Sequence, residues 1–228
     1  MRYSVLLLIL ICYSCQPKHD VPIIIELTEN WQFKKVTDSV WLSATVPGNL
    51  HSDLLDHNLI EDPFIGDNEK DLQWISETEW EYKTSFYLDE ETLQSENIEL
   101  NFEGLDTYAL VYLNDSLILK ANNAFREWNV DIKLLLKAEN ELRILFESTL
   151  KYENAEKEKL PYELPEGERI FTRKAQFQYG WDWGPKLNIS GVWGPIQLTA
   201  WNDGRIFDTY VHQVELNDSI AKLTLQVD

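Results

Sequence analysis

Apolar and polar residues alternate one by one along several separate stretches of this 228-residue chain. Side chains two positions apart lie on the same face of an extended strand, so alternation gives a strand one apolar face. The clearest stretches are 80–88, 98–103 and 141–147, with shared-face positions Trp80, Tyr82, Thr84, Phe86, Leu88, Ile98, Leu100, Phe102, Leu142, Ile144 and Phe146. The pattern predicts half-buried strands and an all-β fold.

The connections between these stretches are short and rich in turn residues. Residues 108–120 predict a β-hairpin, because Asn114 and Asp115 separate two apolar-rich runs and favour a tight turn. Residues 196–201 predict a closing strand. Many short strands joined in this way are typical of a β-sandwich or jelly roll.

Two segments depart from the strand pattern. A short helix is expected from Leu50, because Gly48 and Asn49 supply a cap and Leu54 lies on the same side one turn later. Residues 151–169 are highly charged and contain two prolines, so we expect an exposed loop there.

The final residues carry their own strand signal. Residues 206–216 and 221–228 predict two strands, and the second alternates apolar and polar residues to its end. Two strands alone cannot bury an apolar face in water. We therefore expect residues 205–228 to begin a second domain, and the chain to be truncated within it.

The net charge restricts the class of partner. The chain has 39 acidic and 20 basic residues, which gives a formal charge of −19. A surface of this sign repels phosphate backbones, so nucleic acid is excluded as an expected partner. A neutral ligand such as a sugar is compatible with it.

The amino terminus resembles an export signal. Arg2 precedes the apolar run 5–11, which is far shorter than the roughly 20 residues that a membrane-spanning helix needs. Both cysteines of the chain, Cys12 and Cys15, follow this run. Residues 1–15 resemble a bacterial lipoprotein signal with Cys15 as the lipidated residue, and a simple cleaved signal is the alternative.

This assignment predicts where the protein is found. We expect an exported lipoprotein, periplasmic or anchored to the outer membrane, whose only membrane contact is the lipid on Cys15. Because no other cysteine is present, the rest of the chain has no disulfide and no thiolate metal site.

The segment 176–195 has the most unusual composition, with three tryptophans, four glycines and two prolines around one acidic residue, Asp182. Tryptophan rings pack against the C–H faces of sugars, and a carboxylate accepts hydrogen bonds from neighbouring hydroxyls. In an extended backbone, Trp181 and Trp183 would point one way and Asp182 the other. The alternative is that all three tryptophans belong to the core and Asp182 caps a turn.

A second polar region contains His51, Asp53, His57, Asp62 and Asp67. These residue types can bind metals, but no His-x3-His pair or comparable ligand spacing occurs. We expect turn capping rather than a metal site.

Glu103 and Asp106 flank a glycine and resemble the carboxylate pair of a glycosidase. The sequence cannot select such a pair among 39 acidic residues, so we expect a buried ion pair with Arg126 instead. The sequence contains no G-x-S-x-G motif and no phosphate-binding glycine loop.

Three blocks of the sequence resemble the β-mannosidases of glycoside hydrolase family 2. They are FTRKAQFQYGWDWGPKLNISGVWGPIQL (171–198), the 46–86 block with its VPG, HSDLL, DPF and GDNE elements, and LNFEGLDTYALVYLND (100–115) followed by NNAFREWNVDI. Together they cover most of residues 22–201, and GWDWGP is specific to the mannosidase branch.

The resemblance implies a role for the tryptophan-rich segment. In that family a jelly-roll, galactose-binding-like domain packs beside a (β/α)8 barrel, and a Trp-Asp-Trp loop reaches into the active site of the barrel. Asp182 would bind hydroxyls of the terminal mannose, and Trp181 would line the pocket. Gly180, Gly184 and Pro185 would set the shape of the loop.

The resemblance also implies a division into domains and an activity. Residues 22–204 would form the sugar-binding jelly roll, and residues 205–228 the first strands of an immunoglobulin-like domain. The two catalytic glutamates would lie on the barrel beyond residue 228, so this chain carries no catalytic residue and needs no cofactor or metal. The intact protein would release terminal non-reducing β-D-mannose from β-mannoside oligosaccharides with retention. A stand-alone carbohydrate-binding module and a non-catalytic surface lipoprotein are the alternatives.

Overall fold

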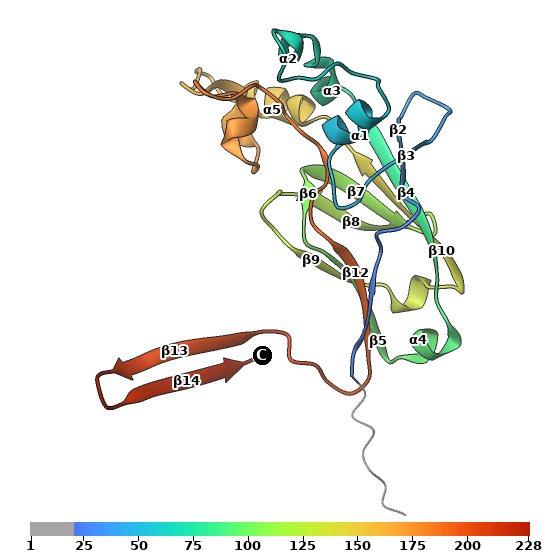
Figure 1. Ribbon diagram of the computed structural model, residues 1–228, viewed down its shortest axis with the longest axis vertical. Coiled ribbons are helices and arrows are strands. Elements are labelled where there is room, and N and C mark those ends of the chain that lie inside the picture. The colour runs from blue at the N-terminus through green and yellow to red at the C-terminus, as the bar shows by residue number, and fades with distance from the viewer. Residues whose placement is uncertain (1–20) are drawn as a thin grey trace, which may run out of the picture.

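Two antiparallel β-sheets pack face to face in a computed structural model, which describes residues 21–228 (Figure 1). The six-stranded sheet contains, in spatial order, β3 (Leu42–Ser43), β2 (Gln32–Lys35), β4 (Trp80–Tyr87), β10 (Glu139–Phe146), β7 (Tyr108–Leu113) and β8 (Ser116–Asn122). The four-stranded sheet contains β1 (Ile23–Glu26), β12 (Ile196–Trp201), β5 (Asn97–Phe102) and β9 (Trp128–Asp131). Two short strands, β6 (Leu105–Asp106) and β11 (Gly191–Val192), pair with each other.

The alternating residues form the core between the two sheets. Strands β4, β5 and β10 bury every second side chain. Leu100 of β5 and Leu142 of β10 are fully buried, as is Phe33 of β2. Burying one such side chain contributes about 1.5–3 kcal/mol, so the alternation drives the pairing of the sheets. The prediction of an all-β sandwich is confirmed.

The hairpin that joins β7 and β8 has the expected turn. Asn114 and Asp115 have φ values of 49° and 65°, which a two-residue hairpin turn of type I′ requires at both positions. The Asn114 side-chain amide also donates to the Leu135 carbonyl at 2.9 Å and to Asn140 Oδ1 at 2.9 Å. The turn is therefore fixed both by its backbone and by the neighbouring loop.

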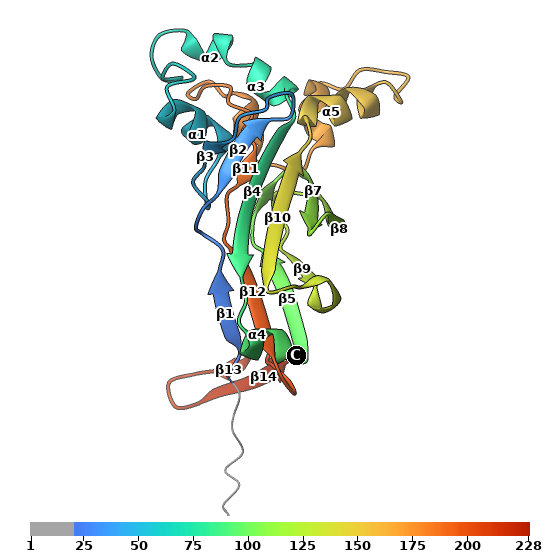
Figure 2. The same ribbon diagram turned by 90° about the vertical axis from the view of Figure 1, so that its right-hand side faces the viewer.

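Helices cover the two ends of the sandwich rather than its faces. They are α1 (Leu50–Asp56), α2 (Asn68–Asp71), α3 (Trp74–Glu77), α4 (Glu90–Gln94) and α5 (Thr149–Lys157), with 3₁₀ turns η1 (Lys133–Leu135), η2 (Gly167–Phe171) and η3 (Gln176–Tyr179). Figure 2 shows α1, α2, α3 and α5 at one end and α4 at the other. Within residues 21–228, no helix has the length and apolar character that crossing a membrane requires.

Helix α1 begins where the sequence predicted. Asn49 is its cap, and the Asn49 side-chain oxygen accepts a hydrogen bond from the Ser52 backbone N–H at 3.1 Å. Leu50 and Leu54 are both buried against the sandwich. The predicted helix is confirmed.

Helix α5 contradicts the exposed loop predicted for residues 151–169. Its buried face consists of Thr149 and Glu153, which lie one turn apart, and contains no buried apolar residue. A helix with a polar buried face has no apolar periodicity, so the pattern used to find helices does not detect it.

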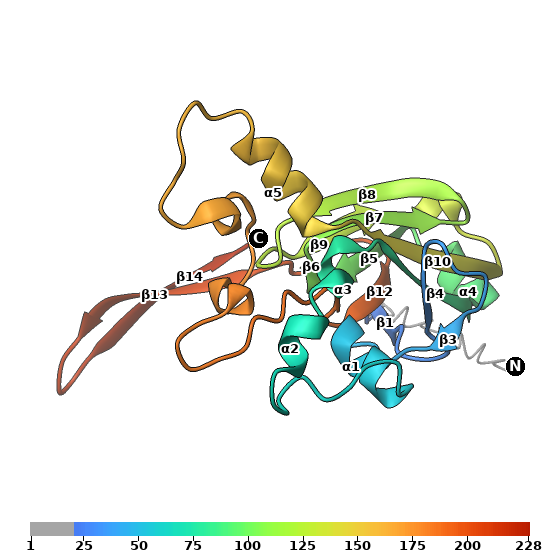
Figure 3. The same cartoon turned by 90° about the horizontal axis from the view of Figure 1, so that it is seen from above.

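The last described residues form a separate antiparallel hairpin, β13 (Thr209–Leu216) with β14 (Ala221–Val227). Figure 3 shows this hairpin projecting sideways from the sandwich. Its apolar side chains are exposed, including Leu223 and Leu225 at 58% and 60%. The two predicted strands are thus present, while their assignment to an immunoglobulin-like domain stays a prediction.

Candidate functional site

The tryptophan-rich segment forms a long loop at the end of the sandwich that carries α1, α2, α3 and α5 (Figures 1 and 3). We define residues 174–190 as the Trp-Asp-Trp loop. Its one helical element is η3, and the strand β11 follows it directly. Because most of the loop has no strand partner, side-chain contacts must determine its conformation.

The tip of the loop is a closed turn. The Trp181 N–H donates to the Gly184 carbonyl at 3.1 Å, and the Gly184 N–H donates to the Trp181 carbonyl at 3.2 Å. Gly180, just before this turn, has φ +92°, a conformation that side chains disfavour. The alternating side-chain directions of an extended backbone therefore do not apply here, because residues 181–184 form a turn.

The three tryptophans are not core residues. Trp181, Trp183 and Trp193 are 50%, 77% and 50% exposed. Trp193 covers Gly104, where an added Cβ would lie 2.4 Å from the indole ring. The alternative in which all three indoles fill the core is thus contradicted.

Asp182 and Trp181 line the same pocket, which has a volume of about 500 Å³. Its other lining residues are Glu69, Arg169, Gly180, Gly184 and Lys186. Within the part of the chain that the structure describes, no group forms a hydrogen bond or ion pair with the exposed Asp182 carboxylate. Both oxygens are therefore available to a ligand.

The wall of the pocket combines an aromatic ring with charge. The Arg169 guanidinium lies 5.8 Å from the centroid of a Trp181 ring, within the range of a cation–π contact. Arg169 also forms an ion pair with Glu166. These contacts restrict the Trp181 indole on one side and leave half of its surface exposed.

Helix α2 and the residues after it brace the return limb of the loop, which is the part that follows the Trp181–Gly184 turn. Glu69 Oε2 accepts a hydrogen bond from the Lys186 N–H at 3.0 Å. Gln73 Nε2 donates to the Lys186 carbonyl at 2.9 Å and to the Glu69 carbonyl at 2.7 Å. Glu69 belongs to the GDNE motif, so the structure brings two of the sequence blocks together at this pocket. The sequence carried the motif but no signal of this contact, which spans more than 100 residues.

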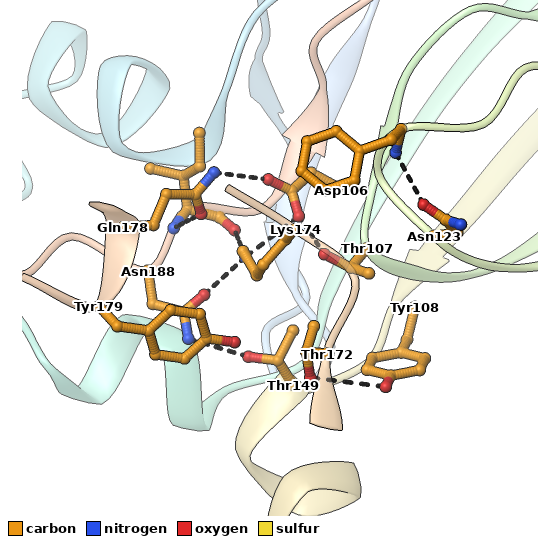
Figure 4. Close-up of polar contacts among 12 residues, drawn as sticks. Asp106, Thr107, Tyr108, Asn123, Thr149, Thr172, Lys174, Gln178, Tyr179 and Asn188 are labelled. Atoms are coloured by element: carbon orange, nitrogen blue, oxygen red, sulfur yellow. Dashed lines mark hydrogen bonds and ion pairs between the residues drawn. The ribbon is translucent and has the colours of Figure 1, made fainter. Parts of the chain in front are cut away.

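A buried polar network lies beneath the loop (Figure 4). Lys174 Nζ donates to Asn188 Oδ1 at 2.6 Å and to the Ile189 carbonyl at 2.6 Å, and it pairs with Asp106 Oδ1 at 3.1 Å. Gln178 Nε2 donates to Asp106 Oδ2 at 2.9 Å. Lys174 and Asp106 are 1% and 2% exposed.

This network corrects the expected partner of Asp106. Its cation is Lys174, whereas the Arg126 guanidinium lies 4.3 Å from the centroid of a Trp128 ring. Both Asp106 oxygens are occupied by residues of the Trp-Asp-Trp loop. The Glu103 and Asp106 pair therefore does not resemble an open glycosidase site.

Burial lowers the pKa of two groups at the network. Burial lowers the pKa of Lys174, while the attraction of Asp106 opposes that change. Burial, and secondarily the charge of Lys174, lowers the pKa of His51 to about 4. His51 is thus neutral at pH 7, and its buried Nδ1 has no hydrogen-bond partner among the described residues.

The residues considered for a metal have structural contacts instead. Asp53 Oδ1 accepts from the Thr45 N–H at 2.9 Å, and Asp53 Oδ2 accepts from the Tyr82 hydroxyl at 2.6 Å. His57 Nε2 lies 2.8 Å from the Ser43 carbonyl oxygen. Across residues 21–228, no group of three or more His, Cys, Asp or Glu side chains is placed to hold a metal ion.

Known proteins with similar sequences include β-mannosidases. β-Mannosidase B of Thermothelomyces thermophilus is 36% identical over 214 residues, which are 90% of this chain and 25% of that protein. β-Mannosidase of Bos taurus is 35% identical over 189 residues, 78% of this chain and 22% of that protein. This chain thus spans about a quarter of the length of these relatives.

Solved structures similar to this chain also include a β-mannosidase. The β-D-mannosidase of Dictyoglomus thermophilum superposes with a TM-score of 0.86 at 38% identity, over 90% of this chain and 26% of that chain. The β-D-glucuronidase of the same organism superposes with a TM-score of 0.59 at 19% identity, over 91% of this chain and 32% of that chain, which supports the fold alone. The resemblance inferred from the sequence blocks is confirmed.

The family comparison covers most of the sandwich. The family described as "Glycosyl hydrolase 2 galactose-binding domain-like" matches residues 31–194, which include the GDNE motif, Asp106 and the whole Trp-Asp-Trp loop. This chain belongs to the glycosyl hydrolase 2 galactose-binding domain-like family.

Proposed function

We propose that this chain is the amino-terminal part of a β-mannosidase that releases terminal non-reducing β-D-mannose. In this proposal, the sandwich supplies a substrate-binding loop to a catalytic barrel that lies beyond residue 228. The observation that carries the proposal is the pairing of an unoccupied Asp182 carboxylate with the exposed Trp181 indole in one pocket. The β-mannosidase relatives support the choice of sugar.

The chemistry of the pocket suits a terminal sugar. The Asp182 carboxylate can accept hydrogen bonds from two adjacent hydroxyls, and such charge-assisted bonds fix the orientation of the ring. The Trp181 indole offers an apolar surface to the C–H face of the same ring. Because the loop presents these groups at the surface, a neighbouring domain can complete the site around them.

The bond cleavage belongs to the proposed barrel. In a retaining glycosidase, one carboxylate attacks the anomeric carbon while a second carboxyl group protonates the leaving oxygen. Water then hydrolyses the covalent glycosyl-enzyme, and the configuration is retained. Asp182 contributes by holding the sugar in the orientation that this displacement needs.

We also propose that the protein is exported and anchored by a lipid on Cys15. Residues 1–15, which carry this signal, lie outside the residues that the structure describes. The support is the order of a basic residue, a short apolar run and a cysteine followed by polar residues.

The proposed activity is tested with the intact gene product on aryl β-mannoside, β-galactoside and β-glucuronide. We expect kcat/KM for the mannoside to exceed the other two by about a hundredfold or more, because a site that hydrogen-bonds hydroxyls in one orientation rejects sugars that carry them in another. Preference for another sugar would contradict the proposal. Mannoside binding without hydrolysis would identify a carbohydrate-binding module instead.

A further inference from the structure

The tip of the Trp-Asp-Trp loop must be held in place by contacts with the rest of the domain if Asp182 is to bind substrate. The turn at Trp181–Gly184 is exposed, and the limbs on either side of it have no continuous strand pairing. A substrate-binding carboxylate must be held to within a fraction of an ångström, because small displacements of a positioning group cost rate. The surface contacts at Lys186 brace only the return limb.

Lys174 joins both limbs of the loop to the sandwich. It lies at the start of the loop, whereas its partners Asn188 and Ile189 lie at the end, 14 and 15 residues later. Its third partner, Asp106, belongs to strand β6. An ammonium group has three donors, and three acceptors surround this one.

The same residues are tied together by neutral side chains. Gln178 bridges the limbs, because its Nε2 donates to Asp106 Oδ2 at 2.9 Å and its Oε1 accepts from the Ile189 N–H at 3.2 Å. Asn188 Nδ2 donates to Thr149 Oγ1 of α5 at 3.1 Å. The network thus connects the loop to β6 and α5 at once (Figure 4).

Burial makes this arrangement sensitive to the loss of one member. Lys174, Gln178 and Asn188 are 1%, 6% and 4% exposed, so water cannot replace a missing partner without a rearrangement. A buried charge that loses its counter-ion is strongly unfavourable. The loop would therefore open rather than retain an unpaired Asp106 or Lys174.

We propose that Asp106 and Lys174, with Gln178 and Asn188, are positioning residues that hold the Trp181–Gly184 turn in its sugar-binding orientation. This proposal rests on the proposed function of Asp182. None of the four side chains lines the pocket, so they act through the backbone of the loop.

The first test measures loop motion in the intact protein by hydrogen exchange. Lys174→Met removes the cation. Gln178→Leu removes the hydrogen bonds of an uncharged side chain and is the substitute variant if Lys174→Met fails to fold. We expect backbone amides of residues 176–190 to exchange about tenfold faster or more in either variant. Lys133→Met is the matched control, because Lys133 Nζ caps the Leu93 and Ser95 carbonyls at 2.5 and 2.6 Å, away from the loop. Unchanged exchange in folded variants would overturn the proposal.

The second test uses aryl β-mannoside hydrolysis. We expect Lys174→Met to lower kcat/KM by about tenfold or more, and to have no further effect when Asp182 is already alanine, because both changes remove the same interaction. An additive loss in the double variant would overturn the positioning role. If the wild-type protein has no mannosidase activity, the proposed function fails, and the exchange measurement alone decides whether the network holds the loop.

Discussion

At the scale of single residues, the two carboxylates associated with the Trp-Asp-Trp loop lie in opposite environments. Asp182 is exposed at the tip and lacks any partner among the described residues. Asp106 is 2% exposed and has both oxygens occupied by Lys174 and Gln178. Because the first can exchange water for a ligand and the second cannot, Asp182 is suited to binding and Asp106 to structure.

Replacement of Asp182 tests its role directly. We expect Asp182→Ala to lower kcat/KM for an aryl β-mannoside about ten- to a hundredfold, since hydrogen bonds to a charged group contribute about 1.5–3 kcal/mol. Stability should change little, because the side chain is exposed. Steady-state kinetics and thermal unfolding of the same preparation give both quantities.

The control for this variant is Asp38→Ala, which removes an exposed aspartate in the connection between β2 and β3. It should leave kcat/KM unchanged. A loss of less than about threefold in folded Asp182→Ala protein would mean that the carboxylate does not contact the substrate strongly.

At the scale of elements, α1 places an ionisable group inside the end of the sandwich. The Leu50 N–H donates to the Ser190 carbonyl at 2.9 Å, so the start of the helix contacts the end of the Trp-Asp-Trp loop. His51 follows and is 8% exposed, with Lys174 as a nearby charge. The first turn of α1 therefore places Leu50 in the apolar core and His51 beside the polar network.

The buried histidine predicts a pH dependence of stability. The pKa of His51 falls from 6.5 to about 4 on folding, so the unfolded state binds the extra proton first as the pH is lowered. We expect this group to destabilise the fold progressively below pH 6.5, by about 3 kcal/mol once the pH is below 4. Urea unfolding at several pH values measures the effect.

His51→Gln should remove this part of the pH dependence, because the variant side chain does not titrate. The control is His212→Gln on the exposed strand β13, which should retain the His51-dependent loss of stability between pH 6.5 and 4. If the free energy of unfolding depends on pH in the same way in the wild type and in His51→Gln, His51 is not the source of the loss of stability.

At the scale of the whole molecule, the Trp-Asp-Trp loop and the projecting hairpin lie on different parts of the sandwich. Helices α1, α2, α3 and α5 gather with the Trp-Asp-Trp loop at one end, whereas β13 and β14 extend sideways (Figures 2 and 3). The apolar face of the hairpin is exposed, as in Leu223 and Leu225. This arrangement leaves the pocket open to the catalytic barrel that we propose completes it.

The proposed lipid anchor is also a property of the whole protein. We expect Cys15→Ala to move the protein from the membrane fraction to the soluble fraction of the cell, because the thiol that carries the lipid is lost. Cell fractionation and immunoblotting measure the distribution. Cys12→Ala is the matched control and should remain with the membrane; equal membrane association of all three proteins would argue against lipidation.

The sequence by itself determined the sandwich, the hairpin turn at Asn114 and Asp115, and the start of α1. These features depend on interactions between residues close in the chain: alternation, positive φ values and a side-chain cap. The sequence blocks by themselves also indicated the family. The sugar-binding role of Asp182 and Trp181 stays a prediction.

Only the tertiary structure decided the shape of the Trp-Asp-Trp loop and the contacts beneath it. Residues 181–184 close into a turn rather than extend, and Lys174 rather than Arg126 proved to be the partner of Asp106. Helix α5 was missed because its buried face is polar. The contact between Lys174 and Asp106 joins residues far apart in the chain, and local patterns carry no information about which buried polar groups will meet.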